Sequence, residues 1–227
     1  MKWIYIIAGI ALYFKMLILP NLTLESFAVL ESVGESSIVE ALVQETSVPN
    51  VVSGIIFRNR LYDTIFEVVV FTLAIMGVRF LLADEQPTTT VHQFTDQPSI
   101  VLARLGATIS ALIAVELAIR GHLSPGGGFA AGVAGGTAIG LVAITASSEY
   151  MESLYQRWQA ARWEKVSVLV FIVCSILSLL GFALPAGTLG TLTSGGWIPI
   201  LNFLVAVKVA LGSWAAVLLF IRYRGLL

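Results

Sequence analysis

The sequence predicts an all-α integral membrane protein with about six transmembrane helices. Hydrophobic residues make up 57% of the 227 residues and charged residues only 12%, whereas soluble domains carry about 25% charged residues. Apolar runs close to the ~20 residues that span a bilayer recur along the chain, separated by polar segments. The formal net charge of −1 leaves no basic surface of the kind that binds nucleic acid.

The apolar runs divide the chain into two parts. They lie at about 3–19, 61–82, 100–119, 126–146, 166–185 and 198–221. The polar segment 83–99 separates a two-helix front part, residues 1–90, from a four-helix back part, residues 91–227. Lys15 interrupts the first run and no small-residue cleavage site follows it. We therefore interpret that run as a retained helix, with a cleaved signal peptide as the alternative.

The segments between the runs are predicted to lie at the membrane surface. Residues 20–60 carry spaced glutamates in a moderately apolar background, which favours short interfacial helices. The triplet Arg58-Asn59-Arg60 comes just before the second run, and the helix begins on one side of it or the other. Residues 147–165 mix charged side chains with tyrosine and tryptophan, as interfacial connections do. Residues 186–197 are an uncharged turn.

The distribution of lysine and arginine predicts the orientation in the membrane, because cytoplasmic loops carry an excess of these residues. With a cytoplasmic N-terminus, that side holds eight of them: Lys2, Arg79, Arg104, Arg157, Arg162, Lys165, Arg222 and Arg224. The other side holds four: Lys15, Arg58, Arg60 and Arg120. We therefore expect a multi-pass protein of the cell membrane with both termini in the cytoplasm.

One stretch, GHLSPGGGFAAGVAGGTAIG at 121–140, combines a polar turn with regularly spaced glycines. Ser124 and Pro125 suit the cap and the first turn of a helix, which predicts that a helix begins here. Four glycines recur every four residues and form a side-chain-free ridge that a second helix can approach closely. The residues assigned to this cap and to helix packing are Pro125, Gly126, Gly127, Gly128, Phe129, Gly132, Gly136 and Gly140.

These glycines do not indicate nucleotide binding. No strand is predicted before them, no Gly-Lys-Ser/Thr follows them, and they lie in an apolar run. The sequence also shows no nucleophile paired with a base and no set of metal ligands at ligand spacing. We therefore expect a subunit without catalytic activity, metal or cofactor of its own.

Five ionisable side chains lie in or next to the predicted spans: Asp63, Glu67, Glu116, His122 and Lys208. Each costs roughly 2.5–3.5 kcal/mol there unless it has a partner or a function. One interpretation is an ion path, because burial brings carboxylates and lysine toward proton exchange near neutral pH. The other is an ion pair between Lys208 and either Glu67 or Glu116 that only fixes helix packing. Snorkelling to water explains Glu116 equally well, and a hydrogen bond that holds the turn explains His122 equally well.

Two stretches carry a resemblance to a known family. The string GHLSPGGGFAAGV, followed by IPILNFLVAVKVALG, resembles the MnhB domain of Mrp-type multisubunit Na+/H+ antiporters and of related membrane-bound hydrogenases. This resemblance covers about residues 100–222. The front part is similar to the module at the C-terminal end of the large Mrp subunit. Where that module has Asp-Phe-Arg and Asp-Thr-Leu-Gly-Glu, this chain has Arg58-Asn59-Arg60 and Asp63-Thr64-Ile65-Phe66-Glu67.

The resemblance implies a natural fusion of the two modules in one membrane complex. Its expected partners are antiporter-like subunits similar to those of respiratory complex I and small membrane subunits, and its transported ions are Na+ and H+. The carboxylate of Glu67 keeps its place in the family pattern, whereas Glu116 falls on no family motif. Three functions remain open: a membrane component of a Na+/H+ antiporter, the equivalent component of a redox-driven complex such as a membrane-bound hydrogenase, and a structural spacer.

Overall fold

The computed structural model describes residues 38–88, 91 and 93–225, and within them it is helical without strands. The elements are α2 (Ile38–Thr46), α3 (Val51–Gly54), a π-helical turn η1 (Ile55–Asn59), α4 (Leu61–Leu81), α5 (Gln97–Arg120), α6 (Gly128–Ala143), α7 (Ser148–Arg157), α8 (Ala160–Leu179) and α9 (Ile198–Arg224). The predicted span at 3–19 and part of the predicted interfacial segment lie outside the described residues.

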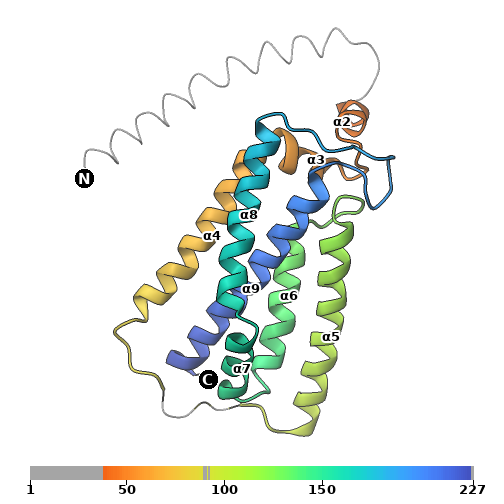
Figure 1. Ribbon diagram of the computed structural model, residues 1–227. Helices are drawn as coiled ribbons and strands as arrows, with labels where there is room; N and C mark the ends of the chain where they lie inside the picture. The colour runs from red at the N-terminus through yellow and green to blue at the C-terminus, as the bar shows by residue number, and fades with distance from the viewer. Residues whose placement is uncertain (1–37, 89–90, 92, 226–227) are drawn as a thin grey trace, which may run out of the picture. The chain divides into compact units, whose positions relative to one another are not determined.

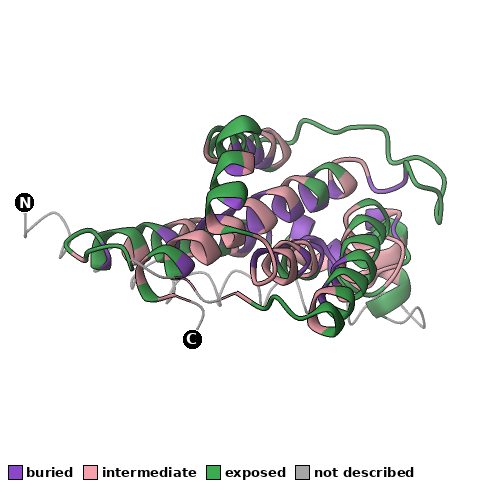
Figure 2. Cartoon of the chain, turned by 90° about the horizontal axis from the view of Figure 1, so that it is seen from below, coloured by how far each residue is buried: buried purple, intermediate pink, exposed green. Residues whose placement is uncertain are grey.

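The helix α9 is the centre of the bundle. It packs against α4, α5, α6, α7 and α8, and α4, α5, α6, α8 and α9 run side by side (Figure 1). The turn between α5 and α6 lies at the same end of the bundle as α3, which we call the cap end. The opposite end carries α7 and the end of α9, and we call it the α7 end. Buried residues lie between the helices and exposed ones around them (Figure 2).

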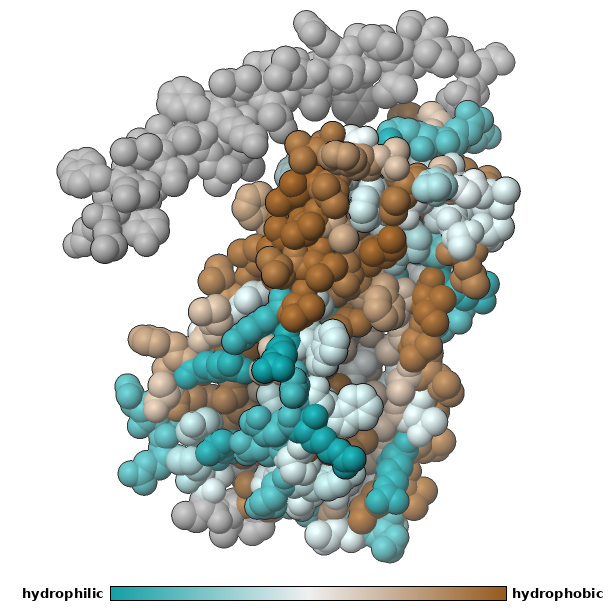
Figure 3. Space-filling model, viewed as in Figure 1, coloured by the Kyte–Doolittle hydropathy of each residue, from teal (hydrophilic) through white to brown (hydrophobic). Residues whose placement is uncertain are grey.

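Three described helices, α4, α5 and α9, are long and apolar enough to cross a membrane. The helix α6 is apolar but has only 16 residues, about 24 Å at 1.5 Å per residue. The helix α8 has 20 residues and carries charges in its first turns. Apolar side chains cover much of the visible surface of α8 and α4, while polar ones gather toward the α7 end (Figure 3). An all-α integral membrane protein is therefore confirmed.

The predicted interfacial connection at 147–165 is mostly helical, and the predicted start of the next span at residue 166 is too late. The helix α7 begins after Ser147, whose Oγ accepts a hydrogen bond from the backbone N–H of Tyr150 at 3.2 Å. Gln159, at φ 49°, turns the chain with a single left-handed residue. The helix α8 then begins at Ala160, six residues before the predicted span at 166–185.

Backbone dihedral angles show where the helices α4 and α6 begin. The helix α4 begins at Leu61, after the triplet Arg58-Asn59-Arg60, because Arg60 leaves helical geometry at φ −122°. The helix α6 begins at Gly128 and not at the predicted Ser124 and Pro125, because φ is 149° at Gly126 and 103° at Gly127. These two residues turn the chain in a conformation that glycine adopts readily. Ser124 Oγ instead donates to the carbonyl oxygen of Arg120 at 3.4 Å.

Candidate functional site

A lysine and a glutamate form a buried ion pair between α9 and α8. Nζ of Lys208 lies 2.6 Å from Oε1 of Glu164. The Lys208 side chain has 0% of its surface exposed and that of Glu164 has 10%. Lys208 lies near the middle of α9, and Glu164 lies in the second turn of α8. Because an unpaired buried charge costs several kcal/mol, this pairing is what allows Lys208 to lie inside the bundle.

Phe71 and Gly212 shape the space around the pair. The Lys208 ammonium lies 4.9 Å from the centre of the Phe71 ring on α4, within the range of a cation–π contact. Gly212 lies one turn after Lys208 on α9. A methyl group at Gly212 would lie 2.7 Å from Cε1 of Phe71 and 3.3 Å from Nζ of Lys208. The glycine therefore leaves the room that the ion pair and the aromatic ring occupy.

The predicted partners of Lys208, Glu67 and Glu116, do not pair with it. Glu116 bonds Arg120 one turn later at 3.0 Å, and both side chains are about half exposed. Asp63 pairs with Arg60 at 2.5 Å at the start of α4. Glu67 is exposed, and within the described part of the chain no ion pair or hydrogen bond reaches its side chain. The structure therefore does not bring the predicted carboxylates together with Lys208, and their place in an ion path stays a prediction.

Sequence reasoning missed Glu164 because this residue falls in the predicted interfacial connection, two residues before the predicted span at 166–185. The signal that finds it is the buried stripe of α8, which recurs at helical spacing: Ala160, Glu164, Ser167, Phe171 and Ser175. Extending that stripe backward from Phe171 by two turns reaches Glu164. The stripe predicts that the carboxylate faces the bundle interior, although it does not identify Lys208 as the partner.

At the cap end, Asn50 joins the front part of the chain to the turn between α5 and α6. Its Nδ2 donates to the carbonyl oxygens of Gly121 at 2.7 Å and Ser124 at 2.8 Å. Ser53 Oγ also donates to the Gly121 carbonyl, at 2.8 Å. These bonds hold the start of α3 against the turn.

Asn202 makes the corresponding connection from α9. Its Nδ2 donates to the carbonyl oxygens of Leu117 at 3.1 Å and Ala118 at 2.8 Å, in the last turn of α5. Helix C-termini leave carbonyl groups without intrahelical partners, and Asn202 satisfies two carbonyls in this turn. A methyl group at Gly121 would lie 2.8 Å from Asn202 Nδ2, so this glycine leaves room for the amide.

His122, in the turn between α5 and α6, is fully buried. Neither of its ring nitrogens has a hydrogen-bond partner among the residues that the structure describes. Burial is the main cause that lowers the pKa of the His122 ring below its ordinary value of 6.5, and the nearby backbone of Thr191 and Leu192 opposes that shift. The ring therefore favours its neutral form in the folded protein.

The glycine ridge of α6 faces α9. A methyl group would lie 2.9 Å from Cβ of Val205 at Gly128, 2.7 Å from Cγ1 of Val209 at Gly132, and 2.6 Å from Cβ of Ser213 at Gly136. Gly140, the fourth glycine of the repeat, has no neighbour within 4 Å. Phe129, next to the first glycine, packs against the main buried apolar cluster. The close approach thus covers three of the four glycines, and the helix that they approach belongs to the same chain.

Comparisons with known proteins find one family and two structural relatives. The family model described as "Domain related to MnhB subunit of Na+/H+ antiporter" matches residues 98–215. The chain is similar to one in the structure of the membrane-bound sulfane sulfur reductase (MBS), an archaeal respiratory membrane complex. That match has 23% identity and a TM-score of 0.65, and it covers 93% of this chain and 99% of that one.

A second similar chain is in the structure of the Mrp complex from Dietzia sp. DQ12-45-1b. It is 19% identical with a TM-score of 0.57, and the match covers 92% of this chain and 26% of that one. No curated protein matches the chain significantly. Both structural likenesses include the front part of the chain as well as the region that the family model matches.

Proposed function

Since this chain belongs to the family of domains related to the MnhB subunit of the Na+/H+ antiporter, we propose that it is a membrane subunit of a multisubunit Na+/H+ antiporter. Its partners are antiporter-like and small membrane subunits, and its transported ions are Na+ and H+. The chain has no catalytic activity of its own in this proposal. In this proposal residues 1–90 and 91–227 act as two fused modules.

The observation that carries the proposal is the ion pair between Lys208 and Glu164. Both residues lie within the matched region, 98–215, and Lys208 lies inside α9, which is apolar enough to cross a membrane. Ionisable groups at such positions are expensive and characteristically serve ion pathways. A structural spacer needs no buried charge, because apolar residues of similar volume pack as well or better.

The orientation with both termini in the cytoplasm is part of the proposal. In that orientation the α7 end faces the cytoplasm, and it holds most of the described basic residues: Arg79, Arg104, Arg157, Arg162, Lys165, Arg222 and Arg224. The cap end holds Arg58, Arg60 and Arg120. This asymmetry supports a cytoplasmic α7 end in the cell membrane.

The experiment uses everted membrane vesicles that contain the complete complex, with vesicles lacking this chain as the control. A proton gradient is established, and a pH-sensitive dye reports how far added Na+ dissipates it. We expect Na+ to dissipate the gradient only in vesicles with the complete complex, and choline to have no effect in either. A complete complex that leaves the gradient unchanged after Na+ addition at every pH would contradict the proposal.

A redox-driven complex is the second candidate, favoured by the match that covers 99% of a chain in an archaeal respiratory complex. The same vesicles separate the two functions. An antiporter exchanges Na+ for protons without an electron donor, whereas a redox-driven pump moves ions only when an electron donor and acceptor are supplied. The proteins that co-purify with this chain provide an independent test, because iron–sulfur or hydrogenase subunits among them would favour the second candidate.

A further inference from the structure

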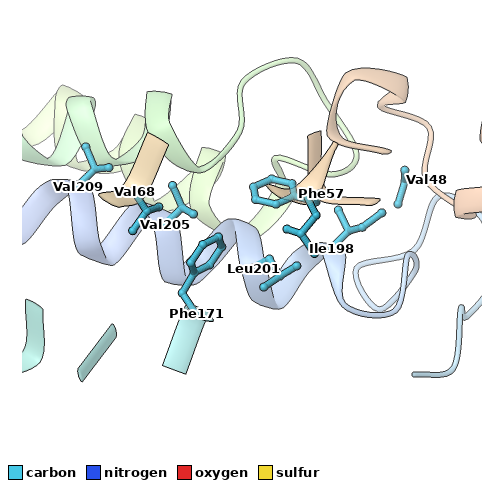
Figure 4. Close-up of a cluster of buried hydrophobic side chains, with 9 residues drawn as sticks. Val48, Phe57, Val68, Phe171, Ile198, Leu201, Val205 and Val209 are labelled. Carbon is cyan, nitrogen blue, oxygen red and sulfur yellow. The ribbon is translucent and has the colours of Figure 1, made fainter. Parts of the chain in front are cut away.

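The bundle is filled differently on the two sides of α9. On the side of α4 and α8, the main buried apolar cluster occupies the space between the helices, and Figure 4 shows its side chains along α9. The helix α5 contributes no residue to that cluster. Its buried side chains are two alanines, Ala103 and Ala107. The half of α5 near the α7 end is therefore packed through small side chains only.

These small side chains leave a groove of about 520 Å³ that α5, α6, α7 and α9 all line. On α5 it is lined by Arg104, Ala107, Thr108 and Ala111, which share one face because they recur every three or four residues. Met151 of α7 lines it as well, which places the groove in the half of the bundle near the α7 end. Apart from Arg104 and Thr108, its lining is apolar or aromatic. Its volume lies in the range of ligand sites, about 300–1,000 Å³.

Arg104 brings a positive charge into a helix that is apolar enough to cross a membrane. It lies seven residues after the start of α5, about 10 Å along the helix axis. Its side chain is exposed, and within the described part of the chain no ion pair or hydrogen bond reaches its guanidinium. Two arginines at the same end are paired, Arg222 with Glu152 at 3.2 Å and Arg224 with Glu85 at 2.6 Å. A charge at the depth of Arg104 is expensive without a partner.

The direction of α5 brings the Arg104 guanidinium toward the membrane surface. The helix begins at the α7 end (Figure 1), and helical side chains lean toward the N-terminus of their helix. A long arginine side chain can therefore keep its aliphatic stem in the apolar layer while its charge reaches the lipid headgroups. A guanidinium binds phosphate through two parallel N–H···O bonds. The groove thus combines a phosphate-binding group at the membrane surface with an apolar channel below it.

The length of the groove distinguishes a lipid from a helix of a partner subunit. The α5 residues that line it span 104–111, about 10 Å along the axis. The hydrocarbon core of a bilayer is about 30 Å thick, so one leaflet contributes about 15 Å. A partner helix that crosses the membrane needs a contact surface along the whole core, whereas an acyl chain stays in one leaflet. The groove fits the chain.

We propose that the groove binds one anionic phospholipid from the leaflet at the α7 end, with its phosphate on the Arg104 guanidinium and one acyl chain between α5, α6 and α7. An anionic lipid fits better than a zwitterionic one, because the cation of a zwitterionic headgroup competes with arginine for the phosphate. Basic pockets between transmembrane helices on the cytoplasmic side characteristically bind acidic lipids. The site goes beyond the proposed function, since it requires no transport of Na+ or protons.

The test identifies the lipid that lies in the groove of the assembled complex. The complete complex is reconstituted in phosphatidylcholine vesicles with a small fraction of photoreactive lipid, either phosphatidylglycerol or phosphatidylcholine, that carries the reactive group on one acyl chain. After irradiation, mass spectrometry measures lipid adducts on the peptides that contain residues 107–111 and 151–154. We expect adducts on both peptides, about fivefold more from phosphatidylglycerol than from phosphatidylcholine, the factor expected for one cation beside an anionic lipid.

The phosphate site is tested by Arg104→Gln. Arg162→Gln is the matched control, because Arg162 is an exposed arginine on α8, which does not line the groove. We expect Arg104→Gln to lower the phosphatidylglycerol adducts about fivefold, to the level of phosphatidylcholine, and Arg162→Gln to keep the unmodified preference. An unmodified preference for phosphatidylglycerol in Arg104→Gln would overturn the proposal.

The acyl-chain site is tested by Ala111→Phe, which fills the groove, against Leu112→Phe, which places a ring at the next residue, outside the groove lining. Both positions are exposed, so neither change overpacks the buried core. We expect Ala111→Phe to remove most adducts on residues 151–154 and Leu112→Phe to leave them. No lipid adduct on either peptide of the unmodified complex would show that a partner subunit occupies the groove, and it would overturn the proposal. Because Na+ transport is not measured, that result would leave the proposed function standing.

Discussion

The two faces of α9 are built on different principles. The face toward α6 is a close contact with three glycines of α6, Gly128, Gly132 and Gly136, which leave no room for even a methyl group. The face toward α4 and α8 encloses the charged pair of Lys208 and Glu164 against the ring of Phe71. The first face depends on shape and the second on charge. One helix thus combines a fixed packing surface with a polar site, and the two are separately testable.

The largest loss of stability is expected from breaking the charged face on one side only. Replacing Lys208 by methionine leaves the Glu164 carboxylate buried without its counter-charge, which costs about 3–5 kcal/mol. Lys165→Met is the matched control, because Lys165 neighbours Glu164 on α8 but is exposed, and it should change stability by less than about 0.5 kcal/mol. Thermal unfolding of the solubilised complex measures both. Equal stability of the two variants would show that the pair contributes nothing to folding.

The close contact between α6 and α9 is tested by adding a single methyl group at one glycine inside the contact and at one glycine beyond it. Gly132→Ala forces the new methyl against Val209 and within 2.9 Å of the Ala206 carbonyl oxygen, and overpacking of this kind costs about 1–3 kcal/mol. Gly140→Ala meets nothing within 4 Å and should be neutral, or stabilising by up to about 1 kcal/mol. Native-gel analysis reports assembly of each variant. If both assemble equally well, the ridge tolerates displacement of α9.

These two faces were not equally predictable from the sequence. The four-residue glycine spacing is local, so it predicts a close-packing surface directly, although it does not show that Gly140 lies beyond the contact. The ion pair joins residues 44 positions apart, and a lone lysine in an apolar run does not identify its partner. Glu164 also lies outside the predicted span at 166–185, although α8 begins at Ala160. The charged and aromatic residues in the first turns of α8 are typical of an interfacial connection, so they do not indicate a helix that enters the bundle.

The main helices were predictable for a related reason. The length of an apolar run reflects the thickness of the membrane, so the spans at 61–82, 100–119 and 198–221 lie close to α4, α5 and α9. The predicted start of α6 is wrong for a local reason. Ser124 and Pro125 are residue types that favour a helix start, but two glycines with positive φ follow them, so the helix begins only at Gly128. Side-chain bonds across the cap, such as those of Asn50, depend on tertiary contacts that sequence spacing does not encode.

Substitutions at Glu67 test whether a carboxylate on the exposed surface of α4 contributes to ion exchange together with the buried pair of Lys208 and Glu164. Glu67 lies one helical turn before Phe71 and is exposed. We expect Glu67→Gln to leave the complex assembled and to reduce Na+/H+ exchange several-fold, and Glu67→Asp to reduce it far less, because glutamine removes only the charge and the proton site. Since Asp63 lies four residues earlier, the double variant is measured as well. Unmodified exchange and pH dependence in Glu67→Gln, at normal subunit levels, would make Glu67 a structural charge.

A smaller effect is expected at His122, which is buried without a partner in the described part of the chain, in contrast to the paired Lys208. Its pKa is lowered in the folded protein, so between that lowered value and 6.5 the unfolded chain binds more protons. The contribution of His122 to the free energy of unfolding is therefore complete above pH 6.5, and it is lost as the pH falls from 6.5 to the lowered pKa. In His122→Gln that part of the pH dependence should disappear. Thermal unfolding of the solubilised complex from about pH 8 to about pH 5 measures it, and identical curves for the two proteins would contradict the prediction.

The central claim, that the buried pair serves ion exchange and not packing alone, is tested most directly by removing both charges together. The double variant Glu164→Gln, Lys208→Met keeps similar volumes and leaves no buried charge unpaired, so it should assemble with near-normal stability. Na+/H+ exchange is then measured in vesicles at matched subunit levels. We predict an assembled complex whose exchange is abolished. An assembled double variant that exchanges Na+ for protons at the unmodified rate and with unmodified pH dependence would show that the pair is structural and would contradict the claim.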